Sequence, residues 1–566
     1  MSEKVLETKN CKQCDSKFEI TDKDLEFYEK VSPVFSWIKY AIPAPTLCPD
    51  CRQQKRLVWR NERNLYRRTC DLSWKSIISI HSPDKKYKVY DQKEWWSDRW
   101  DAMDYGRDFD FSRSFFEQFK ELLYKVPNIS LSIVNSENSD YNNDLLYSKN
   151  AYLCIDSVNI DNSSYISWCK KINNSLDIWW CEEIENSYEI ISSDNIYNSF
   201  YCYRVYYMKN SMFCKECYNC EDCIMCYWLK NKKYHIENKQ YSKEEYEEMK
   251  KNYLNWSHKT ISNLKKELEN FCKKFPQRNI YAYNSTNYTW SNIYNSNECY
   301  ECFDVAWLSK WKYSFDSGWN TSNIIDCSFV YEWDWMIIES INILNSMKSI
   351  FSVNITNSNY IAYSFYLFWC SNCFLSVWLK NKSYCIFNKQ YTKDDYEKLV
   401  PQIIEQMKNN WEWWNFFPSD ISLFWYNETL ANAWFPLSKD NALKNNFNWS
   451  DYEAPFPKVE KIIPAKLLPD NIKDIPDDIL NRAVECEITN KPFKIIKQEL
   501  EFYRKHNLPI PRRHPDQRHL DRMWMRNPRK LYDKKCDKCR KDIKTTYSPD
   551  RSEIIYCEEC FNKEFS

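Results

Sequence analysis

Glycine is almost absent from this chain of 566 residues, in which it occurs only as Gly106 and Gly318. An average usage of about 7% would give roughly 40 glycines. Glycine lets the backbone approach phosphate groups closely and adopt a positive φ, so no glycine-rich nucleotide loop can exist in the chain as written. Tryptophan, in contrast, occurs 26 times.

Several tryptophans stand where a turn would ordinarily contain glycine. Trp74 lies in a Ser-Trp-Lys segment just after Cys70, and Trp228 and Trp378 begin two copies of Trp-Leu-Lys-Asn-Lys. We hypothesise that the source reads UGA codons as glycine and that these codons are translated here as tryptophan. The alternative is a genuinely aromatic-rich chain from an AT-rich genome. UGG codons at Trp74, Trp228 and Trp378 would exclude the reassignment.

A net charge and a long apolar run are also missing. The 79 Lys and Arg residues balance 79 Asp and Glu residues, so no overall field favours nucleic acid or a membrane as a partner. The chain starts with the charged segment Met1–Lys4 and contains neither the apolar stretch of a signal peptide nor a transmembrane segment. The sequence therefore predicts a cytoplasmic protein without a membrane partner.

Cysteine is abundant, with 26 residues. In a reducing cytosol, cysteines serve as metal ligands or small core residues more often than as disulfides. Two Cys-x2-Cys pairs lie near each end of the chain, and two such pairs can supply four thiolates at tetrahedral corners. We predict two structural zinc ions, held by Cys11, Cys14, Cys48, Cys51, Cys536, Cys539, Cys557 and Cys560.

The two ends are copies of one unit. Leu500–Tyr503 repeats Leu25–Tyr28, and His514–Arg518 repeats Cys48–Arg52. Each copy has positions for two metal sites and has kept a different one. The lost site of the first copy is Cys70, Ser73, Asp91 and Glu94, and that of the second copy is Cys486, Thr489, His514 and Gln517. Serine and threonine are poor zinc ligands, so Cys486 with His514, helped by His519, is only a third candidate.

The Cys-x2-Cys pairs, Phe18, the Leu-Glu-Phe-Tyr segments and Cys48-Pro-Asp-Cys51-Arg52 resemble the "probable zinc-ribbon" family of short bacterial domains. The resemblance covers a short segment at each end of the chain. It implies a metal-binding fold and no known activity. The whole arrangement is similar to large uncharacterised proteins of candidate-phylum bacteria, in which such ribbons flank a repeat region.

Between the ends, short runs of Tyr, Phe, Ile, Val and Cys alternate with Asn-Ser corners, which suits coils of short strands. Trp228–Tyr241 recurs as Trp378–Tyr391, and each copy leads into a helix with a capping pair. The sequence predicts a mainly β protein, a parallel β-solenoid in two blocks with helical inserts, flanked by N- and C-terminal zinc-ribbon modules. A pair of antiparallel β domains is the alternative.

These features predict seven segments along the chain. They are an N-terminal zinc-ribbon module (1–110), a first solenoid block (111–238), a helical insert (239–278), a second block (279–391), a helix with an aromatic-rich packing segment (392–451), a proline-rich linker (452–480) and a C-terminal zinc-ribbon module (481–566).

Five cysteines between Cys214 and Cys226 repeat at every third position. Their spacing could indicate an iron–sulfur or zinc cluster. The second block keeps only Cys373 of the last pair, and no proline follows the final cysteine. We therefore interpret the row as small side chains at the corners or in the interior of the solenoid.

A fully cysteine-ligated zinc leaves no position for a catalytic water. With only six histidines in addition, we expect no enzymatic activity. The leading hypothesis is a non-catalytic scaffold or binding protein with an unidentified macromolecular partner, protein in preference to nucleic acid. A second hypothesis is nucleic-acid binding through exposed basic stripes, and a third is a carbohydrate-active β-helix enzyme. The stripes would consist of Arg52, Arg56, Arg60, Arg526, Arg529 and Lys530.

Overall fold

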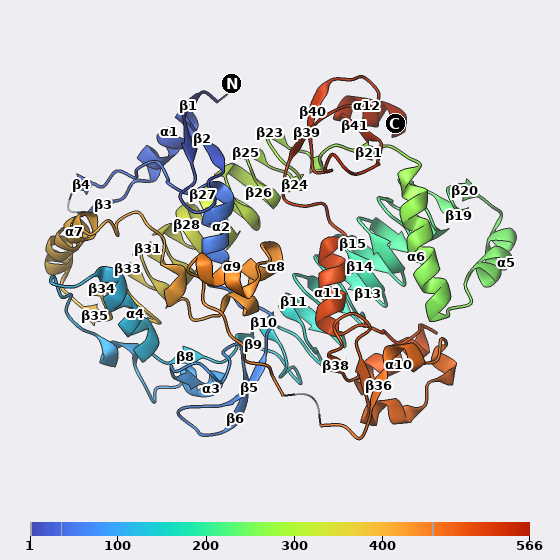
Figure 1. Ribbon diagram of the computed structural model, residues 1–566, viewed down its shortest axis with the longest axis horizontal. Coiled ribbons are helices and arrows are strands. Elements are labelled where there is room, and N and C mark those ends of the chain that lie inside the picture. The colour runs from blue at the N-terminus through green and yellow to red at the C-terminus, as the bar shows by residue number, and fades with distance from the viewer. Residues whose placement is uncertain (1–2, 36, 456–457, 566) are drawn as a thin grey trace. The chain divides into compact units, whose positions relative to one another are not determined.

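The computed structural model describes residues 3–35, 37–455 and 458–565 (Figure 1). Met1, Ser2, residue 36 of the predicted N-terminal module, residues 456–457 of the predicted linker and residue 566 lie outside the described residues. The protein is mainly β, with large sheets in which most strands are parallel. None of the described helices has both the length and the apolar composition that crossing a membrane requires.

The chain divides into two compact units. Unit 1 consists of Met1–Ser130 and Ile280–Tyr452, and unit 2 consists of Leu131–Asn279 and Glu453–Ser566. Each unit therefore combines one end of the chain with one part of the central β region.

Ten strands of unit 2 form one sheet, in the order β20-β19-β18-β17-β15-β13-β12-β11-β10-β9, and β14 pairs with β16 beside it. Paired residues advance by a constant 12 positions: Lys170 pairs with Glu182, Glu182 with Asp194, and Asp194 with Tyr206. The bounds are β9 Ile133–Val134, β10 Asn143–Leu146, β11 Ile155–Asp161, β12 Lys170–Asn173, β13 Glu182–Glu185, β14 Tyr188–Ile191, β15 Asp194–Tyr197, β16 Phe200–Tyr203, β17 Tyr206–Lys209, β18 Glu221–Ile224, β19 Lys233–Ile236 and β20 Lys239–Gln240.

Buried serines and cysteines link neighbouring strands of this sheet. The backbone N–H of Ser175 donates to Ser163 Oγ at 3.0 Å, and that of Ser187 donates to Ser175 Oγ at 3.0 Å. Cysteine takes the same position elsewhere, where the N–H of Cys181 donates to Cys169 Sγ at 3.3 Å. Small side chains with a hydrogen-bonding atom thus satisfy buried backbone groups at the corners between strands.

The remaining elements of unit 2 pack around this sheet. They are α5 Lys243–Tyr253, α6 His258–Lys273, β21 Gln277–Arg278, β36 Ile462–Pro464, η4 Ala465–Leu467, η5 Ile472–Asp474, η6 Asp477–Asn481, β37 Ala483–Glu485, β38 Pro492–Phe493, α10 Lys497–Lys505, α11 Pro515–Trp524, β39 Tyr532–Lys535, β40 Asp542–Thr545, β41 Ile555–Tyr556 and α12 Glu558–Phe565. Leu468, Ile472 and Ile479, in the segment predicted as a linker, are instead buried in the core with α6 and α10.

Unit 1 contains a second large sheet of 14 strands, in which β26, β27 and β28 are the longest. Its register advances by 12 residues where Val353 pairs with Phe365, and by 13 where Ile324 pairs with Ile337. In both large sheets the described pairs are parallel except for β19–β20 and β34–β35. The alternative of two antiparallel β domains is therefore wrong.

The bounds in this sheet are β22 Ala282–Tyr283, β23 Thr286–Tyr288, β24 Ile293–Tyr294, β25 Asn297–Tyr300, β26 Phe303–Lys312, β27 Phe315–Tyr331, β28 Trp335–Leu344, β29 Met347–Ile350, β30 Val353–Thr356, β31 Asn359–Ala362, β32 Phe365–Phe368, β33 Ser371–Phe374, β34 Ser383–Ile386 and β35 Lys389–Gln390. The rest of unit 1 consists of β1 Val5–Asn10, β2 Lys17–Thr21, α1 Asp22–Val31, β3 Val34–Phe35, β4 Ile38–Lys39, α2 Pro49–Leu57, β5 Tyr66–Thr69, β6 Ser76–Ser79, β7 Val89–Tyr90, α3 Gln92–Trp95, η1 Ala102–Tyr105, α4 Phe115–Lys125, β8 Asn128–Ile129, α7 Lys393–Asn409, η2 Ser419–Ile421, η3 Tyr426–Glu428, α8 Leu430–Trp434 and α9 Lys439–Lys444.

Thirteen tryptophans in the described part of the chain have a positive φ. Trp37, Trp74 and Trp411 have φ values of 67°, 60° and 59° and are 94%, 79% and 88% exposed. A non-glycine residue in this left-handed region costs roughly 1–2 kcal/mol, and these three exposed side chains bury too little surface to compensate. They favour the hypothesis that glycine belongs at such positions.

Trp411, which follows the end of α7, shows why glycine would suit such a position. The N–H of Glu412 donates to the Met407 carbonyl at 2.8 Å, which is the Schellman closure of a helix with Trp411 as its left-handed residue. Asparagine, which tolerates this conformation, occupies the same place after α9 and α10, as Asn446 and Asn507. Glycine is the usual residue at this position.

In unit 1, α2 lies against β27 and β28 through buried ion pairs (Figure 1). Arg52 Nε donates to Asp326 Oδ1 at 2.8 Å, and Arg56 Nη1 is 3.7 Å from the same oxygen. The Arg52 guanidinium also lies 5.0 Å from the centre of the Tyr313 ring. Burial together with Asp326 raises the pKa of Glu339, a further partner of both arginines, to about 7.

In unit 2, α11 carries the same pair of arginines. Arg518 and Arg522 both donate to the buried Asp177, the latter at 2.6 Å, and the Arg518 guanidinium lies 4.3 Å from the centre of the Tyr165 ring. We call such a pair of helix arginines on one buried aspartate an Arg–Asp clamp. One clamp in each unit holds the helix of the terminal module on the parallel sheet.

Four of the six residues of the predicted basic stripes are not exposed, whereas Arg529 is half-buried and Lys530 is exposed. Arg52, Arg56, Arg60 and Arg526 are buried. Arg60 pairs with Glu62, and Arg526 lies 4.2 Å from the centre of the Trp180 ring. These four arginines contact acidic or aromatic side chains of their own unit, so their charges are not available to nucleic-acid phosphates.

Removing the aspartate of a clamp is expected to destabilise its unit strongly. Asp177→Ala would leave the buried Arg522 without the carboxylate it pairs with and Arg518 with Glu499 as its acidic partner, and breaking a buried ion pair in this way costs about 3–5 kcal/mol. Denaturant unfolding of the full chain measures the loss. Asp140→Ala, at an exposed aspartate of the same unit, is the control and should change stability by less than about 0.5 kcal/mol. Equal effects of the two substitutions would refute a stabilising clamp.

Candidate metal centres

The first group of cysteines lies in unit 1, between a hairpin and a helix. The turn between β1 and β2 carries Cys11 and Cys14, Cys48 is the N-cap of α2, and Cys51 lies in its first turn. The four sulfur atoms lie within 4.8 Å of one another, and Cys14 Sγ is 3.7 Å from Cys48 Sγ. Only Cys14 of the four is exposed.

The second group lies in unit 2 and has the same construction. The hairpin β39–β40 carries Cys536 and Cys539 in its turn, and Cys557 and Cys560 lie at the start of α12. These four sulfur atoms also lie within 4.8 Å of one another, and Cys539 Sγ is 3.7 Å from Cys557 Sγ. The structure thus brings all eight predicted ligands together in the two expected sets.

In each group one thiol has a lowered pKa, whereas burial and neighbouring thiols raise the pKa of two others, Cys14 and Cys51 in the first group and Cys557 and Cys560 in the second. Hydrogen bonding from Cys51 lowers the pKa of Cys48 to about 5 against the opposing effect of burial. Burial tends to raise the pKa of Cys536, but the backbone N–H groups of Cys539 and Cys557 outweigh it and lower this pKa to about 6. One thiol of each group is thus more acidic than an ordinary cysteine, which favours the thiolate that binds metal.

The same turn occurs at four places in the chain, two in each terminal module. In each turn the residue four positions after the first cysteine donates its N–H to that cysteine's carbonyl and has a positive φ. The four pairs are Asp15 with Cys11 at 3.0 Å, Trp74 with Cys70 at 2.9 Å, Asn490 with Cys486 at 3.0 Å and Arg540 with Cys536 at 2.9 Å. The backbone conformation of these turns is thus the same in the two incomplete sites, although the other cysteine ligands are missing from their sequences.

In the two incomplete sites the cysteine sulfur accepts backbone hydrogen bonds, as Cys536 Sγ does from the N–H of Cys557 at 3.2 Å in a complete site. Cys70 Sγ accepts the N–H of Asp91 at 3.2 Å and that of Ser73 at 3.4 Å. Cys486 Sγ accepts the N–H of Thr489 at 3.5 Å. The third candidate is not assembled: among the described residues, no metal-competent group includes Cys486, His514 or His519. His514 instead caps α11, where its Nδ1 accepts the N–H of Asp516.

The row from Cys214 to Cys226 likewise forms no metal-competent group among the described residues. Its sulfur atoms are buried and hydrogen-bonded to backbone carbonyl groups. Cys214 Sγ donates to the Met212 carbonyl at 3.3 Å, as the hydroxyl of Ser175 donates to the Asn173 carbonyl at 2.8 Å. This placement agrees with the interpretation of the row as small interior side chains.

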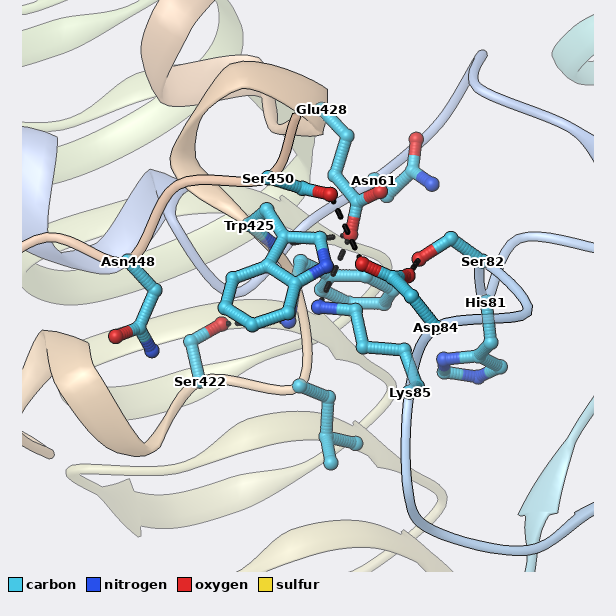
Figure 2. A network of polar contacts seen from close by, with 12 residues as sticks. Asn61, His81, Ser82, Asp84, Lys85, Ser422, Trp425, Glu428, Asn448 and Ser450 are labelled. Atoms are coloured by element: carbon cyan, nitrogen blue, oxygen red, sulfur yellow. Dashed lines mark hydrogen bonds and ion pairs between the residues drawn. The ribbon is translucent and has the colours of Figure 1, made fainter. Parts of the chain in front are cut away.

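A buried polar network in unit 1 could not be found from the sequence (Figure 2). Lys85 Nζ is 3.2 Å from Glu428 Oε1 and 3.9 Å from the centre of the Trp425 ring. Tyr66 donates its hydroxyl to Glu428 Oε2 at 2.8 Å. Burial lowers the pKa of Lys85 to about 8, although Glu428 opposes this shift.

The network joins η3 to the N-terminal module of unit 1. Ser450 Oγ also donates to Asp84 Oδ2 at 2.9 Å, beside the same lysine (Figure 2). The partners lie far apart in the sequence: Tyr66 and Glu428 are 362 positions apart, and Asp84 and Ser450 are 366 positions apart. No local pattern could therefore have revealed them.

No protein-family model matches this sequence, and no curated protein matches it. Among solved structures, that of a proposed acetyltransferase from Desulfovibrio desulfuricans G20 is similar over 46% of this chain and 71% of that chain. The two are 9% identical in sequence, with a TM-score of 0.12. A likeness of this size carries no argument about fold or activity.

Proposed function

We propose that this protein is a non-catalytic zinc-binding protein of the cytoplasm. Two structural zinc ions hold zinc-ribbon modules at the chain ends onto a parallel β-solenoid, which serves as a scaffold or binding surface for a macromolecular partner. The observation that carries the proposal is the convergence of four cysteine sulfur atoms within 4.8 Å in each module.

The donor sets suit zinc in a structural role. Four thiolates in tetrahedral array are typical of zinc or iron–sulfur centres, and Cys-x2-Cys knuckles are common in structural zinc sites. A site closed by four cysteines leaves no coordination position for water, so the metal would stabilise the fold and take no part in chemistry. None of the 26 cysteines, all of which the structure describes, is in a disulfide, so the eight proposed ligand sulfur atoms are available to bind metal.

The sheet register supports the solenoid. The 12-residue step between Lys170, Glu182, Asp194 and Tyr206 is what a chain winding once per strand would produce. Each turn would bury one row of small and apolar side chains and leave another row on the surface. Such a surface is long and regular, as a scaffold for an extended partner requires.

Elemental analysis of the purified full chain tests the proposal. We expect two zinc ions per chain, one in each four-cysteine group, and no iron. Cys51→Ser and Cys560→Ser should each lose one zinc, whereas Cys217→Ser, in the interior row, should keep both. Should a ligand variant fail to fold, stepwise release of zinc from the wild-type chain by a thiol reagent still counts the sites. Stoichiometric iron, or a chain without zinc, would contradict the proposal.

A further inference from the structure

A groove of about 590 Å³ runs across the outer face of the unit 2 sheet, over β12, β13, β15 and β17. The residues that line it come from successive strands at the 12-residue step. One column contains Lys171, Glu183, Asn195, Tyr207 and Asn219. Polar and aromatic side chains thus repeat along the groove, one at each 12-residue step, in a column that we call the ladder.

The charges of the groove cancel. The lining contains two lysines, Lys171 and Lys209, and two glutamates, Glu183 and Glu185, and Lys171 forms an ion pair with Glu183 at 2.5 Å. A polyanion such as nucleic acid would meet the two carboxylates, and a polycation would meet the two lysines. Charge complementarity therefore favours a neutral ligand.

The remaining side chains suit a ligand rich in hydroxyl groups. Tyr197 and Tyr207 line the groove and are 45% and 49% exposed, and exposed aromatic rings of this kind can pack against the C–H side of a sugar ring. Asn195 Nδ2 donates to Asp194 Oδ1 at 2.9 Å and Asn219 Nδ2 donates to Asn231 Oδ1 at 2.7 Å, and each of these amides has a second N–H group with which a sugar hydroxyl can bond.

A protein partner fits this groove less well. Its aliphatic lining residues, Ile184 and Ile196, are buried, so they expose little aliphatic surface to an anchoring residue of a protein partner. The backbone of β13 and β15 is already paired within the sheet, so an added strand would find no free edge here.

We propose that this groove binds a neutral oligosaccharide chain that lies across the strands. Neighbouring strands are about 4.8 Å apart, close to the advance of one sugar unit in an extended chain, so successive sugars would meet equivalent positions of the ladder. The inference rests on the proposed function, because it names the ligand of the binding surface assigned to the solenoid.

Isothermal titration calorimetry of the zinc-loaded full chain tests this inference, with cellohexaose, laminarihexaose and maltohexaose as probes. We expect saturable binding of at least one, and a loss of affinity of about tenfold or more in the double variant Tyr197→Ala/Tyr207→Ala. Tyr283→Ala/Tyr360→Ala, at two exposed tyrosines of unit 1, is the matched control and should bind as the wild type does.

Three results would overturn the inference. They are no binding of any hexasaccharide, unchanged affinity in the groove variant, and tighter binding of a heparin hexasaccharide or of a protein through the same tyrosines. Zinc content measured on the same samples separates the two proposals. A chain with both zinc ions and no sugar binding refutes the sugar groove alone, whereas a chain without zinc refutes the zinc-binding function.

Discussion

A Cys51→Ser variant is expected to lose one metal ion and to release α2 from β27 and β28. Cys48 caps α2, Cys51 lies in its first turn, and Arg52 follows directly. Metal bound by these cysteines therefore fixes the point from which Arg52 and Arg56 reach Asp326. Structural zinc contributes about 10–16 kcal/mol of apparent binding free energy in zinc-finger peptides, more than the roughly 3–5 kcal/mol of a buried ion pair. Unit 1 should lose several kcal/mol of stability.

Unit 2 provides an internal control for this effect. There α11 has Gln517 where α2 has Cys51, yet Arg518 and Arg522 keep their contacts with Asp177. Chelation of the wild-type chain should raise hydrogen exchange in α2 by about tenfold or more and leave α11 nearly unchanged. Peptide-resolved hydrogen–deuterium exchange measures both helices in one sample. Equal responses would show that metal and clamp are independent.

The triple variant Trp37→Gly/Trp74→Gly/Trp411→Gly is expected to be more stable than the chain as written. Each exposed tryptophan occupies the left-handed region at roughly 1–2 kcal/mol, which glycine adopts without this penalty. We therefore expect a gain of about 3 kcal/mol in the free energy of unfolding. Denaturant titration of the two proteins measures it.

Tryptophans inside the core of unit 1 provide the opposite control. Trp59 and Trp95 are fully buried and do not have a positive φ. Their replacement by glycine should cost at least about 3–5 kcal/mol. We also expect UGA codons at Trp37, Trp74 and Trp411, and UGG codons at Trp59 and Trp95. A destabilised triple variant would reject the glycine hypothesis for these positions.

The metal ligands could be predicted from the sequence because their geometry is local. Two cysteines separated by two residues place both sulfur atoms on one tight turn, so Cys11 with Cys14 and Cys536 with Cys539 specify half of each site. The parallel sheets were also predictable, since Asn-Ser corners recur between β-forming runs. The 12-residue step was obscured because serine and cysteine alternate at the same interior positions, as Ser157 and Cys169 do.

The partners of the arginines could not be predicted. Asp326 lies 274 positions from Arg52, and Asp177 lies 341 positions from Arg518. Arg52, Arg56 and their neighbours form a basic run when only the local sequence is read, and such runs usually indicate an exposed surface. The opposing carboxylates come from β27 and from the segment between β12 and β13, which no sequence pattern connects to the terminal modules.

The division of the chain into two interleaved units has a consequence for its synthesis. Unit 1 needs residues up to Tyr452 and unit 2 needs residues beyond Glu453, so neither is complete while the ribosome is still translating the central region. Translation proceeds at about 5–20 residues per second, so Asp326 is synthesised of the order of half a minute after Arg52. During that interval the nascent N-terminal module must hold its own fold. An early metal ion at Cys11, Cys14, Cys48 and Cys51 would keep it from aggregating until its sheet arrives.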